Sequence, residues 1–555
     1  MQIWSVARKK TSKGSGLIDY KPVLVRFEPT NSIRLYPWTY TLNFTTLTFF
    51  CLRLALIDLS FKNTYLGLGK GFYELRKPTP VAQPSLIKFN TELAAELGVV
   101  ADDQNHDQDE ALLAGIFSGN VIHETSEPLA MAYAGHQFGH FNPQLGDGRA
   151  IYLGELGLAD GGFLDIQLKG SGQTLYSRNG DGRAALGPVL REYLVSEAMH
   201  KLDVPTTRAL AAVTTGEEVA REQLLPGGII TRAASSFIRV GSFQYFQMQE
   251  DVESVKALAD YVIERNYPEV ADAPNPYTAL LEAVVLRQAS LIAQWMQFGF
   301  IHGVMNTDNM SIAGETIDYG PCAFMDFYDH AQVYSSIDRN GRYAYNNQAS
   351  IGLWNLSRFA ETLLPLFADD TDVAVDMAKG ILQKYIGRYD EAWLANMRAK
   401  CGLTACAGVN VENDKALIES LLEIMADHQA DFTLTFYHLS QINAEPGDKD
   451  ADIQNLFSKP GAIDPWLAQW RQRLSSETMH DSERQASMQL VNPVYIPRNH
   501  QIEAVIRAAE DHDDFAPFNT LHDVLQNPYQ YQPGKQAYML PPEPEEVVHK
   551  TFCGT

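Results

Sequence analysis

The sequence contains little cysteine. Its 555 residues include five cysteines and no CxxC pair, so neither a zinc ribbon nor a disulfide scaffold is indicated. The cysteines are Cys51, Cys322, Cys401, Cys406 and Cys553. This usage fits a reducing compartment, and we expect a cytoplasmic protein. Cys553, third from the C-terminus, is the one thiol that we mark as a candidate for redox activity.

Basic residues are also scarce relative to acidic ones. Lys and Arg number 44 against 68 Asp and Glu, which gives a net charge of -24. A general nucleic-acid binder would carry a basic footprint, so we expect no nucleic-acid partner. Hydrophobic residues make up 45% of the chain, which is typical of a core-forming globular protein. The length allows two or three domain-sized units, or one large enzyme core with additions.

Long hydrophobic runs are missing as well. The run TLTFFCLRLALI, at residues 46–57, is interrupted by Arg53 and is too short for a membrane span. We therefore expect no membrane partner. The first residues are basic and poor in acids, and no clear cleavage site follows. We interpret residues 1–60 as a poorly ordered N-terminal extension. The alternative is a transit peptide, which would place the protein in mitochondria.

Residues 61–248 are predicted to be rich in strands. RAIYLGEL and FLDIQLKG read as consecutive antiparallel strands around a Gly-rich turn. Alternation along the second strand places Asp165, Gln167 and Lys169 on one face, opposite its apolar residues. Further strands are predicted at TRALAAVTT, GGIITRAA and SFIRVGSFQYF.

The pentapeptide GDGRA occurs twice, at residues 146–150 and 180–184. Closely spaced glycines before a strand let backbone N–H groups approach a phosphate, and a lysine on the next strand supplies a point charge. The first copy offers Gly146, Gly148 and Arg149 for this purpose, with Lys169 on the following strand. Gly-Asp-Gly is also common in hairpin turns, so chance reuse of a turn is the alternative.

A helix is predicted at LGPVLREYLVSEAMHKL, with Pro188 in its first turn. A kinase-like site needs a carboxylate here to orient the strand lysine. Glu192 and Glu197 are both available, and the helical periodicity does not choose between them. Arg232 and Arg239 stand among apolar residues further on and are candidates to hold phosphate oxygens; surface salt bridges are the alternative.

After residue 249 the pattern becomes helical, and one segment there carries several polar side chains. HGVMNTDNMSIAGETIDYGPCAFMD, at residues 302–326, reads as a loop followed by a short hairpin formed by MSI and TIDYG. That hairpin would bring Asn309 and Asp318 together. Their amide and carboxylate oxygens suit a divalent ion such as Mg²⁺, although Asx residues near glycines are also ordinary turn formers.

The order of these parts is that of a protein kinase. We therefore predict an α+β, protein-kinase-like bilobal fold. Its parts would be a strand-rich N-lobe at residues 61–248, a helical C-lobe at 249–442 and a helical C-terminal extension at 443–555. Two departures count against kinase chemistry: H-R-D and D-F-G are absent, and Val304 stands where H-G-D-x-x-x-x-N kinases have their catalytic Asp. A valine cannot accept a hydroxyl proton.

From about Asn63 to the C-terminus the chain resembles the selenoprotein O (SelO) family, kinase-fold proteins that transfer AMP from ATP to protein hydroxyls. The resemblance rests on long, specific motifs: AGHQFGHFNPQLGDGRA, DIQLKGSGQTLYSRNGDGRAALG, HGVMNTDNMSI and IDYGPCAFMD. It implies a nucleotide reversed relative to that of a kinase, with the α-phosphate exposed to attack. It implies ATP as co-substrate, Mg²⁺ or Mn²⁺ as metal, and a role linked to redox or stress homeostasis.

The resemblance also assigns roles to residues of this chain. Asp308 would accept the hydroxyl proton, and Asn309 and Asp318 would hold the metal. Glu192 would pair with Lys169. The nucleotide contacts would come from Gly146, Gly148, Arg149, Lys169, Asp181, Gly182, Arg232 and Arg239.

The partners would be ATP and proteins with Ser, Thr or Tyr hydroxyls, and we expect a monomer. Some family members have a Cys after the metal segment that pairs with a C-terminal Cys. Tyr334 stands at about that place here, and Cys322 is the only nearby alternative. A true kinase, a non-catalytic nucleotide-binding pseudokinase and the use of UTP are the alternatives.

Overall fold

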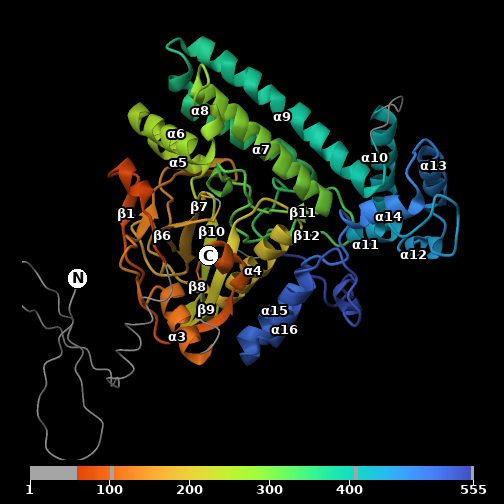
Figure 1. The fold of residues 1–555 in the computed structure, drawn as a ribbon, viewed down its shortest axis with the longest axis horizontal. Coiled ribbons are helices and arrows are strands. Elements are labelled where there is room, and N and C mark those ends of the chain that lie inside the picture. The colour runs from red at the N-terminus through yellow and green to blue at the C-terminus, as the bar shows by residue number, and fades with distance from the viewer. Residues whose placement is uncertain (1–58, 100–105, 160, 405–410, 552–555) are drawn as a thin grey trace, which may run out of the picture.

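The computed structural model describes residues 59–99, 106–159, 161–404 and 411–551. The chain is a mixed α/β protein whose strands come first and whose helices dominate afterwards (Figure 1). The predicted N-terminal extension falls almost wholly outside the described residues, and so does Cys553.

Eight strands of the described residues form one antiparallel sheet, in the order β1-β3-β6-β7-β10-β9-β2, with β8 paired to β10. Their bounds are β1 Tyr73–Leu75, β2 Ser85–Phe89, β3 Leu129–Met131, β6 Ala150–Gly157, β7 Phe163–Lys169, β8 Ala184–Ala185, β9 Arg208–Ala220 and β10 Leu224–Ala234. A separate hairpin pairs β4 Gly135–Gln137 with β5 His140–Asn142. The predicted pairing of β6 with β7 is confirmed, and Ala150 lies opposite Lys169.

The two faces of β7 differ in chemistry, as its alternation predicted. Ile166 and Leu168 are fully buried in a hydrophobic cluster that also contains residues of α2 Thr91–Glu96 and α3 His106–Phe117. Asp165 and Gln167 on the other face are also buried, and polar partners satisfy them. This polar face continues to Lys169, which lies at the end of the strand nearest the predicted site.

The helix α4 Leu186–Lys201 forms where the sequence predicts it and packs on the sheet. Its apolar residues Leu190, Tyr193 and Leu194 are buried with residues of β9 and β10. Two helices from the end of the chain, α15 Asn499–His512 and α16 Ala516–Leu525, cover α4 from outside (Figure 1). The last part of the chain therefore completes the core around the strand-rich part.

The predicted strand at SFIRVGSFQYF is wrong. Residues 236–238 form no regular strand and Arg239 is extended, but the chain then forms the helix α5 Val240–Gln247. Val240, Phe243 and Phe246 recur at helical spacing and are buried together. The hydroxyl of Ser242 accepts the backbone N–H of Arg239 at 3.2 Å, which fixes the start of the helix.

The helical part is built on α7 Pro276–Phe298, which packs against α8 Gln348–Phe367 and the long α9 Thr371–Lys400 (Figure 1). The side chain of Asn275 caps α7 by accepting the N–H groups of Tyr277 and Thr278. The helix ends at Gly299, whose φ of 67° is left-handed. The chain then enters β11 Phe300–Ile301, which pairs with β12 Ala323–Phe324 and so closes the loop of residues 302–322.

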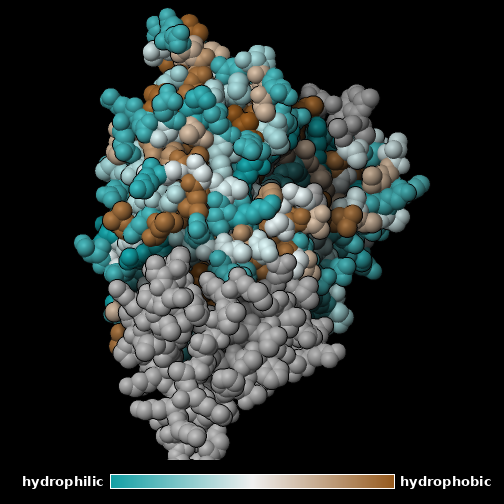
Figure 2. Space-filling model, turned by 60° about the vertical axis from the view of Figure 1, so that its left-hand side comes forward, coloured by the Kyte–Doolittle hydropathy of each residue, from teal (hydrophilic) through white to brown (hydrophobic). Residues whose placement is uncertain are grey.

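The remaining helices lie around α7, α8 and α9 and in the C-terminal part of the chain. They are α6 Val252–Asn266, α10 Val411–His428, α11 Phe432–Leu439, α12 Asp450–Gln454, α13 Asp464–Leu474 and α14 Asp481–Gln489. Short 3₁₀ helices occur at η1 Thr64–Leu68, η2 Pro268–Val270, η3 Thr307–Asn309, η4 Tyr345–Asn347 and η5 Gln536–Tyr538. Within the described ranges, none of the helices has the length and apolar character needed to cross a membrane. In the part of the face that Figure 2 colours by hydropathy, hydrophilic residues predominate and hydrophobic ones are scattered among them.

The predicted hairpin of MSI and TIDYG is also wrong. Ser311 bridges to Arg239 and Thr316 bridges to Thr206, so the two stretches pair with other parts of the chain instead of with each other. Asp318 then takes a left-handed backbone conformation, with φ of 64°, that a regular strand does not allow. Asn309 and Asp318 are therefore positioned by tertiary pairing.

Candidate active site

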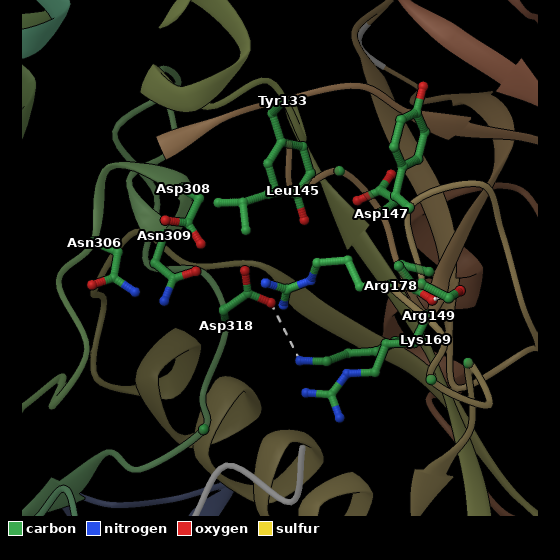
Figure 3. A pocket seen from close by; sticks show the side chains of 18 of the residues that line it. Tyr133, Leu145, Asp147, Arg149, Lys169, Arg178, Asn306, Asp308, Asn309 and Asp318 are labelled. Atoms are coloured by element: carbon green, nitrogen blue, oxygen red, sulfur yellow. Dashed lines mark hydrogen bonds and ion pairs between the residues drawn. The ribbon is translucent and has the colours of Figure 1, made fainter. Parts of the chain in front are cut away.

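A cavity of about 860 Å³ lies between the sheet and the segment that follows β11. Figure 3 shows Asp308, Asn309 and Asp318 on one side of it and Asp147, Arg149, Lys169 and Arg178 toward the other. Every predicted site residue except Glu192 lines it. These residues are Gly146, Gly148, Arg149, Lys169, Asp181, Gly182, Arg232, Arg239, Asp308, Asn309 and Asp318. Residues from distant parts of the sequence thus meet around one space.

The first glycine loop is held tightly against Tyr176. Gly146 has φ of 84°, and a Cβ there would lie 2.3 Å from Cγ of the Tyr176 ring. A Cβ at Gly148 would lie 2.8 Å from the Tyr176 carbonyl oxygen. Between them, the buried carboxylate of Asp147 accepts the Met131 N–H at 3.1 Å. The loop is therefore fixed, with its backbone open to the cavity as a phosphate cradle requires.

The second glycine loop lies at the mouth of the cavity. Gly182 has φ of 67°, and a Cβ there would lie 2.2 Å from the backbone of Gly172. Asp181 is exposed and forms an ion pair with Arg221 at 2.8 Å. Its carboxylate also accepts the backbone N–H of Arg183 at 2.9 Å. These contacts hold the pKa of Asp181 below its usual range against the opposing effect of burial.

Lys169 contacts Glu192 of α4, with Nζ 2.6 Å from Oε2. Glu197, the other carboxylate that the sequence offered, lies elsewhere and pairs with Arg208 at 2.9 Å. Glu192 also contacts Arg232 at 3.2 Å, so one buried carboxylate orients two cations. Glu192 itself stands behind the cavity wall, since it is 3% exposed.

Asp318 is surrounded by three cations. Its carboxylate lies 2.6 Å from Arg232 and 3.2 Å from Lys169 (the dashed line in Figure 3), and it also pairs with Arg239. Burial alone would raise the pKa of Asp318, but the three cations hold it well below its usual range. Arg232 and Arg239 are 2% and 3% exposed, so surface salt bridging does not describe them. The carboxylate is kept ionised at the cavity wall.

Asp308 lies on η3 with a different environment. It is 6% exposed, and burial raises its pKa to about 6, with the hydrogen bond from Gln137 acting in the opposite direction. The Gln137 amide donates to Oδ2 at 3.0 Å, while Oδ1 has no hydrogen-bond partner. One oxygen is therefore fixed by Gln137, and the other lies unpartnered beside Gly135, in a carboxylate that lines the cavity.

Asn309 and Asp318 fit a hard divalent cation, which takes oxygen ligands. The amide nitrogen of Asn309 donates to the Val304 carbonyl at 3.0 Å, so its amide oxygen is free to bind. The part of the chain that the structure describes has no group of three or more His, Cys, Asp or Glu side chains that could hold a metal. An ion here would complete its coordination with phosphate oxygens and water, as Mg²⁺ commonly does.

Sequence reasoning assigned no role to several residues in or beside the site, among them Gln137, Asn306 and Tyr343. Gln137 contacts Asp308, and the side-chain oxygen of Asn306 accepts the Phe138 N–H at 3.1 Å and the Tyr343 hydroxyl at 2.6 Å. Gln137 lies in the motif AGHQFGHFN, which the resemblance singled out without a role for this position. No local pattern indicates Tyr343, because it comes from a loop distant in sequence.

Comparison with known proteins shows the family of this chain. A sequence model of the family described as "Protein adenylyltransferase SelO" matches residues 55–526. A protein of Rhizobium meliloti (strain 1021), named "Protein nucleotidyltransferase YdiU", is 57% identical over 495 residues, which cover 89% of this chain and 99% of that protein. A protein of the same name from Bradyrhizobium sp. (strain BTAi1) is 56% identical over 499 residues, 90% of this chain and 100% of that protein.

A third protein of that name, from Rhodopseudomonas palustris (strain BisB18), is 55% identical over 500 residues, 90% of this chain and 100% of that protein. The matched span includes both glycine loops, α4 and the segment with Asp308, Asn309 and Asp318. The chain belongs to the SelO family of protein adenylyltransferases.

Proposed function

We propose that this chain transfers AMP from ATP to Ser, Thr or Tyr hydroxyls of other proteins. The observation that carries the proposal is the state of Asp308: a buried carboxylate with one unpartnered oxygen, beside Asn309 and across from a cluster of cations. A carboxylate of this kind suits a proton acceptor. Val304 supports the assignment of this role to Asp308. It occupies the position of the usual kinase base, and its side chain is apolar and 5% exposed.

In the proposed step, the hydroxyl oxygen of the protein substrate attacks the α-phosphorus of ATP. The bond between the α-phosphorus and the bridging oxygen breaks, and pyrophosphate leaves with the bonding electrons. The hydroxyl proton passes to the carboxylate of Asp308. The ATP would lie reversed relative to a kinase, so that its α-phosphate faces Asp308.

Lys169, Arg232 and Arg239 would neutralise the phosphates, and the backbone of Gly146, Gly148 and Gly182 would approach them closely. Arg149 and Asp181 complete the proposed nucleotide contacts. Asn309 and Asp318 would hold Mg²⁺ or Mn²⁺, which would neutralise charge that develops on the phosphate oxygens. Asp318 is already ionised for that purpose, and its present cationic partners would turn to the phosphates.

We also propose a kinase-like bilobal arrangement, with an N-lobe at residues 61–248, a C-lobe at 249–442 and an extension at 443–555. The pairing of a strand lysine with a helix glutamate, Lys169 with Glu192, supports it. Arg498 from the extension contacts Asp326 at 2.5 Å and Asp431 at 2.8 Å, which would fasten the extension to the C-lobe. We further propose that the protein is a monomer and is cytoplasmic, the latter in keeping with its few cysteines.

The test is incubation of the enzyme and a protein extract with ATP labelled on either the α- or the γ-phosphate. The proposal expects label on protein from the α position alone. Label from the γ position alone would identify a kinase and overturn the proposal. Repeating the assay with UTP, and with Mg²⁺ or Mn²⁺, selects the nucleotide and the metal. Asp308→Ala should abolish labelling while ATP still binds. A non-catalytic nucleotide-binding protein would bind ATP but would give no label even without the substitution.

A further inference from the structure

A surface beside the site is formed by the β4–β5 hairpin and the loop of residues 336–343. Phe138 and Ile337 line the cavity at its rim, and Ile337 is 59% exposed there. The ring of Phe138 lies 5.0 Å from that of Tyr343. The rim next to Asp308 is therefore apolar.

This rim is tied to the segment that carries Asp308. Asn306 accepts the Phe138 N–H and the Tyr343 hydroxyl, at 3.1 and 2.6 Å. Gln137, the neighbour of Phe138, donates to Asp308. A chain that rests on the rim would thus be held at a fixed position relative to the proton acceptor.

The loop that carries Ile337 has an uneven arrangement of charge. Its one acid, Asp338, is buried and accepts the backbone N–H groups of Arg342 at 2.9 Å and Tyr343 at 2.8 Å. Its two arginines, Arg339 and Arg342, form no ion pair with any carboxylate of the described residues. Nε of Arg342 has no hydrogen-bond partner. The loop presents unneutralised positive charge in a chain whose net charge is -24.

Arg342 is positioned next to the hairpin. A Cβ at Gly139 would lie 3.6 Å from its guanidinium carbon, and the guanidinium lies over the Trp354 ring at 4.7 Å. The next arginine along, Arg358, differs because Glu361 neutralises it at 2.6 Å. Arg342 therefore has a defined place and a free charge.

We propose that Phe138, Ile337, Arg339 and Arg342 form the docking surface for the protein substrate, and that the surface selects hydroxyls flanked by Asp or Glu. The target hydroxyl enters the cavity past Phe138 and Ile337, and an acidic side chain near it pairs with the two arginines. Carboxylates suit guanidinium groups, which donate in a planar fork. The inference rests on the proposed AMP transfer and adds its substrate class.

The test maps the sites of AMP modification by mass spectrometry after the full-length enzyme acts on a soluble protein extract with ATP. We expect Asp and Glu to be enriched around the modified hydroxyls of the wild type. The double variant Arg339→Glu/Arg342→Glu should lose the enrichment, with modification of acidic sites about five-fold lower. The single variant Arg339→Glu, at an exposed residue, should show part of the loss without disturbing the fold.

A matched control is Lys379→Glu/Lys459→Glu. It changes the net charge by the same amount, at exposed residues outside the loop of residues 336–343. It should keep the enrichment, and both double variants should keep the wild-type Kd for ATP. If no protein receives AMP from the wild type, the proposed function itself fails. If proteins are modified without acidic enrichment, or the enrichment survives in Arg339→Glu/Arg342→Glu, the docking inference alone fails. The same holds if the arginines prove to bind a single-stranded oligonucleotide while substrate preference stays unchanged.

Discussion

Replacing Glu192 with Gln should weaken ATP binding, and the structure gives a matched control for this change. Glu192 holds Lys169 at 2.6 Å and Arg232 at 3.2 Å with its side chain almost fully buried. A hydrogen bond to a charged group contributes about 1.5–3 kcal/mol. Loss of about 2 kcal/mol in the orientation of the two cations corresponds to roughly 30-fold weaker ATP binding.

Glu197→Gln is the control, because Glu197 is on the same helix, equally buried, and pairs with Arg208 at 2.9 Å away from the cavity. Both variants should lower the melting temperature by similar amounts, since each removes one charge of a buried pair. Only Glu192→Gln should raise the Kd for ATP, measured by isothermal titration calorimetry. If Glu197→Gln weakens ATP binding as much, the effect is a general loss of stability in α4, and the reasoning about Lys169 is refuted.

Two further changes have defined outcomes. Gly146→Ala should weaken ATP binding roughly ten-fold or more, because φ is 84° and the Tyr176 ring occupies the space of the methyl group. The control is Gly380→Ala on an open helix face, which should leave the Kd for ATP unchanged in the same titration. Lys400 is buried among aromatic rings, and burial lowers its pKa to about 7 from the ordinary 10.5. The cost of burying it is largest below pH 7 and disappears as the pH rises to about 10.5, so Lys400→Met should raise the melting temperature at pH 7 and have little effect at pH 10.5. An unchanged melting temperature of Lys400→Met at pH 7 would contradict this prediction.

The elements with a regular pattern could be predicted from the sequence. β7 alternates apolar and polar residues, whereas β6, β9 and β10 contain short, mostly apolar runs that are buried. In α4 and α7 the apolar residues recur at helical spacing and are buried. The stretch at residues 236–246 misled because its apolar residues fit both periods over a short length. Packing of α5 against the rest of the core decides the helix, and that packing is not visible locally.

The sequence predicts which residues form the site, but only part of how they are arranged. Arg232 and Arg239 were identified because arginine among apolar residues requires a partner, and the structure supplies Asp318. The hairpin that was expected to join Asn309 and Asp318 does not form, because each stretch pairs with a distant segment. The contact of Gln137 with Asp308 joins residues 171 positions apart, so no local pattern could indicate it.

The role of Asp308 as proton acceptor is the central claim, and single-turnover kinetics of Asp308→Asn test it most directly. General-base catalysis contributes about 10²- to 10⁴-fold, so the rate of AMP transfer from enzyme-bound ATP should fall by that factor. The Kd for ATP should stay near that of the wild type, because Asp308 faces the hydroxyl and the phosphates are held by other residues. A transfer rate within a few-fold of the wild type, with ATP binding intact, would contradict the account.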